Sequence, residues 1–171
     1  MTLSIIIVNY KTKKLLRQCL RGIYRYPPDV EFEIIVVDNG SADGSVAMVK
    51  DEFLEVHLFA LLKNEGYAKG SNIAIKEARG EFLLFMNADI AVLADSFKSL
   101  LAFMRKRPAV GMAGPQLLNP DRTIQHSAFC WYNLLTPFCR RTWLKFTGLG
   151  KNELARFLIL EWDHRTERKV D

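Results

Sequence analysis

Short apolar runs recur along the chain, and a polar turn follows most of them. Runs of four or five β-branched or large apolar residues are typical of strands buried on both faces of a parallel sheet. The pattern predicts five such strands, at Leu3–Asn9, Glu33–Asp38, Val56–Leu62, Glu81–Met86 and Val110–Gly114. The gaps between them are long enough to hold the crossover helices that parallel strands require.

The stretches between these strands place apolar residues three and four positions apart, which is the period of a helix. They predict four helices, at about Thr12–Tyr26, Asp43–Phe53, Tyr67–Ala78 and Ala94–Arg107. This alternation of strand and helix predicts an α/β fold of the Rossmann type, a sandwich in which helices flank a mostly parallel central sheet.

The residues that follow the last of these strands have a different pattern. A turn at Asn119–Arg122 separates two short predicted strands, Gln116–Leu118 and Thr123–His126. Beyond them, Ala128–Gly150 is rich in aromatic and basic residues, and Asn152–Trp162 has the composition of a helix. The aromatic and basic segment either packs with a solvated rim or touches a membrane surface that carries anionic lipid.

Polar residues follow two of the predicted strands directly. Asp38-Asn39-Gly40-Ser41 comes after the second strand, and Asn87-Ala88-Asp89 comes after the fourth. The carboxyl ends of parallel strands meet at the edge where open α/β sheets bind ligands. Mg²⁺ or Mn²⁺ bound through one or two carboxylates can bridge the oxygens of a diphosphate. We therefore expect a site for a nucleotide diphosphate and a divalent cation at this edge.

The two acidic segments suggest different roles. Asp89 is the expected metal ligand, and Asn87 points to the same side if the chain is extended, so it would assist the metal or hold a sugar hydroxyl. Asp38 would accept hydrogen bonds from a base or ribose, with Asn39 and Ser41 adding polar contacts. Asp38 is equally well explained as a cap or turn residue, and Asp89 as an ordinary loop residue.

The third predicted helix and the loop before it supply further candidates. Asn64 and Gly66 lie in that loop, where a small residue lets the backbone approach a ligand closely. Asn72 is expected on a mostly apolar stripe of the helix, and a buried amide requires partners. Its partner is then either the ligand or another core group.

Composition narrows the classes of function. The 171 residues are 49% hydrophobic and carry a net charge of +5, which suits one globular core and an anionic partner. No glycine-rich turn follows the first strand and no Walker A loop is present, which argues against NAD binding and against a P-loop. The pair His126 and Cys130 is more typical of packing than of a metal site. We expect no nucleic-acid partner.

The number of cysteines and the length of the apolar runs indicate where in the cell the protein is expected. The three cysteines form no even disulfide framework, so reduced thiols in a cytoplasmic protein are expected. No apolar run reaches the ~18 residues that a membrane span requires. A place at the inner face of the membrane is left open.

Four blocks of the sequence together resemble the family 2 glycosyltransferases, and their order and spacing both fit. These blocks are Ser4–Tyr10, Val36–Ser45, Asn64–Asn72 and Gly80–Asp89. The turn at Asn119–Arg122, with the residues up to Ser127, is similar to the rhamnosyltransferase-like branch of that family. The resemblance covers about residues 3–127, and Asn87 stands where other branches have the first Asp of an Asp-x-Asp-type metal motif.

The resemblance implies a GT-A fold and inverting transfer of a sugar from a dTDP- or UDP-sugar to a glycan or lipid-linked acceptor, as in polysaccharide biosynthesis. It implies that Asp38 holds the base or ribose beside the backbone of Val8 and Asn9, and that Asp89 binds the metal. It also implies a nucleotide-sugar half at 1–127 and a partial acceptor-side segment at 128–171.

The acidic motif that supplies the catalytic base in the family has no counterpart among the last carboxylates of the chain, Asp163, Glu167 and Asp171. The resemblance therefore implies a chain truncated before that motif, with the base beyond Asp171. Two alternatives stay open at this point. One is a nucleotide-sugar-binding module without turnover, and the other is a nucleotidyltransferase, which would release free pyrophosphate.

Overall fold

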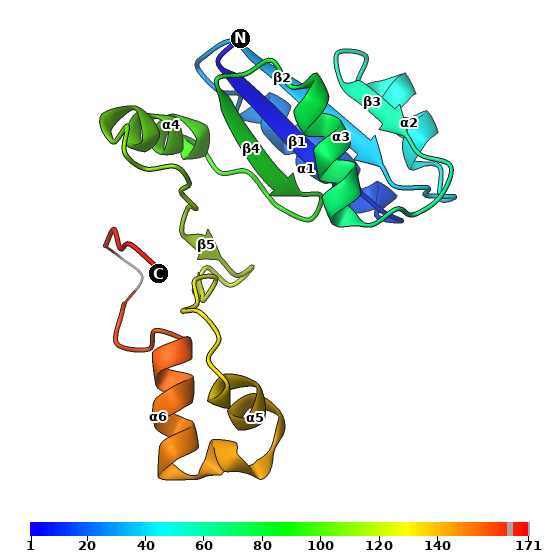
Figure 1. Ribbon diagram of the computed structural model, residues 1–171. Coiled ribbons are helices and arrows are strands. Elements are labelled where there is room, and N and C mark those ends of the chain that lie inside the picture. The colour runs from blue at the N-terminus through cyan, green and yellow to red at the C-terminus, as the bar shows by residue number, and fades with distance from the viewer. Residues whose placement is uncertain (164–165, 171) are drawn as a thin grey trace. The chain divides into compact units, whose positions relative to one another are not determined.

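The computed structural model describes residues 1–163 and 166–170 and consists of two compact units, Met1–Gly111 and Met112–Asp171. The first unit is built on a four-stranded parallel sheet with the order β3-β2-β1-β4 (Figure 1). Its strands are β1 (Leu3–Asn9), β2 (Phe32–Asp38), β3 (His57–Ala60) and β4 (Phe82–Asn87). The first four predicted strands and the α/β fold are thereby confirmed.

Successive residues of a strand point to opposite sides of the sheet, and these strands are apolar on both sides. Helices therefore cover both faces of the sheet. The helices are α1 (Lys13–Arg25), α2 (Ser45–Glu52), α3 (Tyr67–Glu77) and α4 (Ser96–Lys106). Ile5 and Ile7 of β1 join the larger core together with α1, α2 and α4, whereas Ile6 joins a smaller core under α3. Figure 1 shows α3 on one face of the sheet and α1 on the other.

The predicted fifth strand at Val110–Gly114 is wrong. These residues form no strand and are largely exposed, with Met112 at 90%. Pro108 and Pro115 flank the segment and Gly111 and Gly114 interrupt it, so few side chains are available to pack and ladder donors are lost. The division between the two compact units falls within this segment.

The second unit begins with a small antiparallel ribbon, β5 (Leu117–Leu118) and β6 (Ile124–Gln125). The predicted turn between them is confirmed: the backbone N–H of Asn119 donates to the carbonyl of Thr123 at 2.8 Å. Helix α5 (Leu135–Arg141), the 3₁₀ helix η1 (Trp143–Phe146) and helix α6 (Gly148–Phe157) follow. The predicted helix at Asn152–Trp162 thus begins and ends earlier than expected.

No described helix in either unit is both long and apolar enough to span a membrane. Cys19, Cys130 and Cys139 are all free, as the odd number of cysteines predicts. The functional division at residue 127 stays a prediction. Asp163 and Glu167 are exposed, and Asp171 lies outside the described residues.

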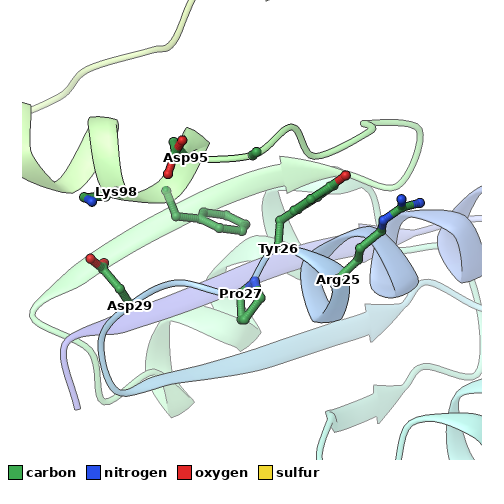
Figure 2. Close-up of a pocket in the computed structure, with 8 residues that line it drawn as sticks. Arg25, Tyr26, Pro27, Asp29, Asp95 and Lys98 are labelled. Carbon is green, nitrogen blue, oxygen red and sulfur yellow. The ribbon is translucent and has the colours of Figure 1, made fainter.

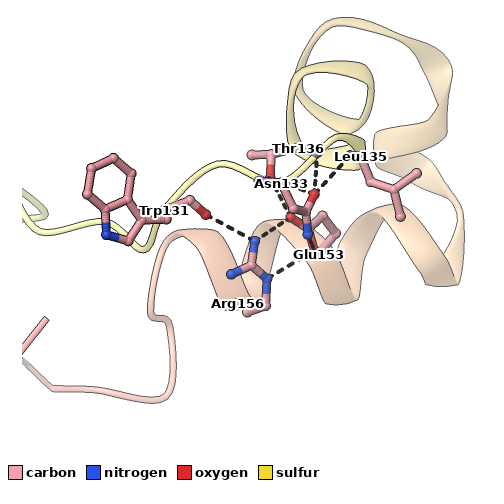
Figure 3. Close-up of polar contacts among 6 residues, drawn as sticks. All are labelled: Trp131, Asn133, Leu135, Thr136, Glu153 and Arg156. Carbon is pink, nitrogen blue, oxygen red and sulfur yellow. Dashed lines mark hydrogen bonds and ion pairs between the residues drawn. The ribbon is translucent and has the colours of Figure 1, made fainter. Parts of the chain in front are cut away.

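A buried carboxylate organises the second unit (Figure 3). Glu153 on α6 accepts hydrogen bonds from Thr136 at 2.5 Å and from Asn133 at 3.0 Å, and Arg156 pairs with it at 2.8 Å. Arg156 also donates to the carbonyl of Trp131 at 3.3 Å. The hydrogen bond from Arg156, followed by that from Thr136, lowers the pKa of Glu153 to about 2.

The low pKa of Glu153 predicts that the second unit loses stability in acid. Its pKa is about 2 in the folded chain, against an ordinary value of 4.5, so protons bind the unfolded state more readily. The stabilisation is therefore complete above pH 4.5 and is lost as the pH falls toward 2. Urea unfolding followed by tryptophan fluorescence measures it, because all three tryptophans, at 131, 143 and 162, belong to this unit.

The Glu153→Gln variant should lose this acid dependence, and Asp51→Asn, an exposed change in the first unit, should keep it. An unchanged slope between pH 5 and pH 2.5 in Glu153→Gln would contradict the assignment.

Candidate functional site

The carboxyl ends of β1 and β2 hold a buried polar pair. Asn9 and Asp38 are partners in the parallel register, and the Asn9 Nδ2 donates to Asp38 Oδ2 at 2.8 Å. The second carboxylate oxygen, Oδ1, accepts from the backbone N–H of Ser41 at 2.8 Å. Asn9 is 0% and Asp38 1% exposed. Asp38 therefore forms a turn with Ser41, which is one of the two explanations that the sequence allows.

Asp38 does not cap a helix. Helix α2 begins at Ser45, whose backbone N–H donates to Asp43 Oδ1 at 3.0 Å. The other Asp43 oxygen accepts from the backbone N–H of Lys13 at 3.0 Å, which ties the beginning of α1 to that of α2. Burial raises the pKa of Asp43, but hydrogen bonds from Ser45 and from the Lys13 backbone outweigh it, so the net pKa is lowered.

The loop after β2 is bound to the loop after β3. Asn39 donates to Asn64 Oδ1 at 2.9 Å and accepts from the backbone N–H of Glu65 at 2.8 Å. Gly40 makes the close approach possible, since it has φ +77° and an added Cβ would lie 2.6 Å from the Lys63 backbone. The structure thus brings together Asn39 and Asn64, which the sequence predicted for the same site.

Three further predicted residues lie around this pair of loops. Ser41 Oγ accepts from the backbone N–H of Lys11 at 2.8 Å. Gly66, with φ +87°, has open space on the side where a Cβ would be. Val8 packs against α3, because a Cβ at Gly70 would lie 3.0 Å from Val8 Cγ1. Sequence reasoning assigned no role to Gly70, although a glycine inside a helix is a signal of close approach.

Asn72 is not the buried amide that the sequence analysis expected. It is exposed, and α3 instead buries Gly70, Ser71 and Ala74 against the sheet. The buried face of α3 therefore lies about one residue away from the apolar stripe that the sequence predicted, because Gly70 lets the helix approach β1 closely. Ser71 carries the polar group in this face, and within residues 1–163 and 166–170 its hydroxyl has no hydrogen-bond partner.

Asn87 and Asp89 lie on the same side of the chain at the end of β4, as predicted. Both are exposed, whereas Met86, just before them, and Ala88, between them, are buried. In the register, Asn87 pairs with Val8, so this segment is adjacent to the end of β1. The strand ends therefore bring Asp89 to the same sheet edge as Asp38.

The buried thiol of Cys19 contacts this segment. Burial raises the pKa of Cys19 to about 12, and the negative charge of Asp89 adds to the shift. Cys19 donates to the Asn87 carbonyl at 3.7 Å. A thiol with a raised pKa is a poor nucleophile and a poor metal ligand.

The side chains at the end of β4 fit a divalent cation whose remaining ligands come from water and from a bound phosphate group. Among the described residues, no group of three or more His, Cys, Asp or Glu side chains gathers in one place. Asp89 offers one exposed carboxylate, with the Asn87 amide on the same side. Mg²⁺ commonly keeps several waters and is bound by one or two carboxylates plus phosphate oxygens, and the side chains of Asp89 and Asn87 are of the kind that such a site uses.

Two lysines after β1 supply positive charge that the sequence analysis overlooked. Lys11 has φ +55°, and the ammonium group of Lys13 lies beside Gly44, 2.9 Å from where a Cβ would be. Lys63 and Lys69 are also close, but both contact Glu65, at 3.6 and 2.8 Å. Among the described residues neither Lys11 nor Lys13 forms an ion pair, although the Lys11 ammonium lies 5.1 Å from the centre of the Tyr10 ring. Both lysines can therefore meet an anion at this edge.

A surface pocket of about 330 Å³ lies elsewhere on the first unit (Figure 2). Its walls combine Arg25 and Lys98 with Asp29 and Asp95, around Tyr26. Helix α1 ends at Arg25, so the pocket is at the amino edge of the sheet, and it contains none of the predicted site residues. Opposed charges also make it a poor match for a diphosphate.

Comparisons with known proteins agree with the geometry. The family model described as glycosyl transferase family 2 matches residues 4–152. The chain is 38% identical over 97 residues to the uncharacterized glycosyltransferase YfnE of Bacillus subtilis, covering 56% of this chain and 25% of that protein. It is 34% identical over 128 residues to the O-antigen biosynthesis protein RfbC of Myxococcus xanthus, covering 71% of this chain and 10% of that protein.

Solved structures give the same result. TarS 1–349 of S. aureus in complex with UDP-GlcNAc matches with a TM-score of 0.56 and 28% identity, covering 68% of this chain and 37% of that chain. The mannosyltransferase PcManGT of Pyrobaculum calidifontis, in complex with GDP-Man and Mn²⁺, matches with a TM-score of 0.53 and 25% identity, covering 70% and 36%. The present chain thus matches only a part of each of these proteins.

Proposed function

Because the chain belongs to glycosyl transferase family 2, we propose that its first unit binds a nucleotide diphosphate sugar and that the protein transfers the sugar, with inversion, to a glycan or lipid-linked acceptor. The donor class proposed is a dTDP- or UDP-sugar. One observation carries the proposal: the ends of β1, β2 and β4 bring Asn9, Asp38 and Asp89 to one edge of a parallel sheet. The neighbour bound to UDP-GlcNAc supports it.

The surroundings of Asp38 favour a ligand-binding role. Glu33, the other buried acid of β2, is paired with Arg79 at 3.0 Å, whereas no described basic side chain pairs with Asp38. Each Asp38 oxygen accepts one hydrogen bond from a neutral donor, which leaves a lone pair on that oxygen for a further donor. A ribose hydroxyl or a base N–H would donate the missing hydrogen bond to this buried carboxylate, and the ligand would then lie beside the backbone of Val8 and Asn9.

The remaining predicted residues would act from the loops. Asn39 and Asn64 hold the two loops in place, and Ser41 holds the Lys11 backbone, so these three would shape the nucleoside pocket. Gly66 leaves open space where a ligand would pass, and the exposed amide of Asn72 would meet it from α3.

A divalent cation, when bound, neutralises the charge that develops on the leaving diphosphate. Asp89 would hold it, with Asn87 beside it, and the neighbour solved with Mn²⁺ supports a cation of this kind. Lys11 and Lys13 would attract the diphosphate from the β1 side. The acceptor hydroxyl must then lose its proton to a general base within hydrogen-bond reach.

Titration calorimetry with UDP and with dTDP tests the proposal. We expect saturable binding that is at least tenfold tighter with Mn²⁺ or Mg²⁺ than with a chelator, because Asp89 would hold a cation whose charge attracts the diphosphate. Free uridine should bind equally with and without metal, since it carries no phosphate. Equal UDP binding in both conditions would exclude the metal role, and release of free pyrophosphate from a nucleoside triphosphate would identify a nucleotidyltransferase instead.

A further inference from the structure

The second unit exposes a run of large apolar side chains. Trp143 is 71% and Phe146 70% exposed on η1, and Leu134, at the beginning of α5, is 89% exposed. Phe138 and Leu149 on the neighbouring helices are also exposed. Helices α5, η1 and α6 contact one another, so these exposed side chains gather on one small helical unit. Isolated exposed apolar residues are ordinary, but several on one small unit indicate an interaction site. We call residues 134–149 the apolar segment.

Helix α5 sorts these side chains to one side. Leu134, Phe138 and Arg141 follow each other at four- and three-residue spacing, so they share one face. Thr136 and Cys139, on the opposite face, are buried. The outward face of α5 therefore carries two large apolar side chains and a guanidinium, and contributes nothing to the core of the unit.

The charge around the apolar segment has a single sign. No Asp or Glu occurs between Asp121 and Glu153, and Glu153 itself is buried and paired with Arg156. Arg140 is used internally, because it donates to the Tyr132 hydroxyl and lies over the Phe157 ring. The exposed cations that remain are Arg141, Lys145 and Lys151.

We propose that the apolar segment binds the surface of a lipid bilayer that contains anionic lipid. Aromatic and aliphatic side chains that sit at the acyl boundary, with Lys and Arg at the headgroups, are the recognised composition of such an interface. The cores of protein interfaces are instead depleted of charge, whereas here the three cations lie within and beside the apolar segment. This inference concerns where the protein is held and does not depend on sugar transfer.

Fluorescence of one tryptophan tests the contact directly in the full chain. In the variant W131F/W162F only Trp143 emits, and its emission should shift to shorter wavelength with vesicles of phosphatidylcholine and phosphatidylglycerol. Vesicles of phosphatidylcholine alone should cause little shift, and added salt should reverse the anionic effect.

Matched variants separate charge from apolar contact. Each basic residue near an anionic surface contributes about fivefold to the partition coefficient, so R141Q/K145Q/K151Q should bind roughly 100-fold more weakly in co-sedimentation. The control K50Q/K76Q/K106Q removes the same charge from exposed positions of the first unit and should bind normally. W143S/F146S should lose binding, whereas L54S/L62S, also highly exposed, should not.

Three results would overturn the proposal. One is an unshifted Trp143 emission with anionic vesicles, and another is equal loss of binding in the two charge variants. The third is a dimer in sedimentation equilibrium that W143S/F146S dissociates, which would assign the apolar segment to a protein interface.

Discussion

Asp89→Asn is expected to remove the metal dependence of UDP binding while leaving the fold unchanged. Asp89 is exposed at the end of β4, and asparagine keeps its shape but removes the charge that, in the proposed site, would hold a divalent cation. In the presence of Mn²⁺ the variant should bind UDP roughly 100-fold more weakly, falling to the affinity that the parent has without metal. Calorimetry with and without a chelator measures both values.

Two comparisons make this result specific. Glu81→Gln removes an equally exposed charge just before the beginning of β4, at the opposite edge of the sheet, and should leave UDP binding unchanged. Asp38→Ala should weaken uridine and UDP alike, by about 1.5–3 kcal/mol, because it removes a charged hydrogen-bond acceptor rather than a metal ligand. Metal dependence that survives in Asp89→Asn would refute the assignment of Asp89, and an Asp38→Ala chain that is destabilised yet binds uridine normally would leave Asp38 a purely structural turn residue.

Gly40→Ala is expected to destabilise the first unit by about 2–4 kcal/mol. Alanine at φ +77° is strained, and its Cβ would lie 2.6 Å from backbone atoms of Lys63 that no rotamer change can move. The loop after β3 must then retreat, and the hydrogen bond from Asn39 to Asn64 is lost with it. Urea unfolding followed by far-UV circular dichroism gives the free energy, and calorimetry should show weaker UDP binding.

Gly44→Ala is the matched control for that experiment. Gly44 has nearly the same φ, +80°, but its added Cβ would meet only the end of the flexible Lys13 side chain at 2.9 Å. The difference between the two variants therefore reports the clash with the β3 loop and not the backbone strain. Equal losses of stability in both would show that the close approach at Gly40 is unimportant.

The sequence predicted the parts of the fold that depend on local pattern. The first four strands, and the common side of Asn87 and Asp89, follow from apolar runs and from the two-residue period of a strand, which a single chain displays directly. The expected burial of Asn72 was wrong because the orientation of α3 depends on its approach to β1 through Gly70, which is a tertiary contact. The strand predicted at Val110–Gly114 was wrong because the flanking prolines and the two glycines within the segment outweigh its short apolar pattern.

The candidate site was predictable in position but not in its internal bonds. A carboxylate after an apolar run indicates the carboxyl edge of a parallel sheet, and both Asp38 and Asp89 follow such runs. The bond from Asn9 to Asp38 depends on the parallel register of β1 and β2, and the link from Asn39 to Asn64 joins loops separated by α2 and β3. Neither contact leaves a periodic signal in the sequence.

The strand order β3-β2-β1-β4 also has a consequence for biosynthesis. The ribosome makes β1, β2 and β3 in succession, and β2 and β3 each add to the strand made just before, so this half of the sheet can assemble as it emerges. The other edge of β1 stays unpaired until Phe82–Asn87 has been made. During that interval a nascent chain displays an apolar strand with free backbone groups, which makes it a substrate for chaperones and prone to pairing with a neighbouring nascent chain.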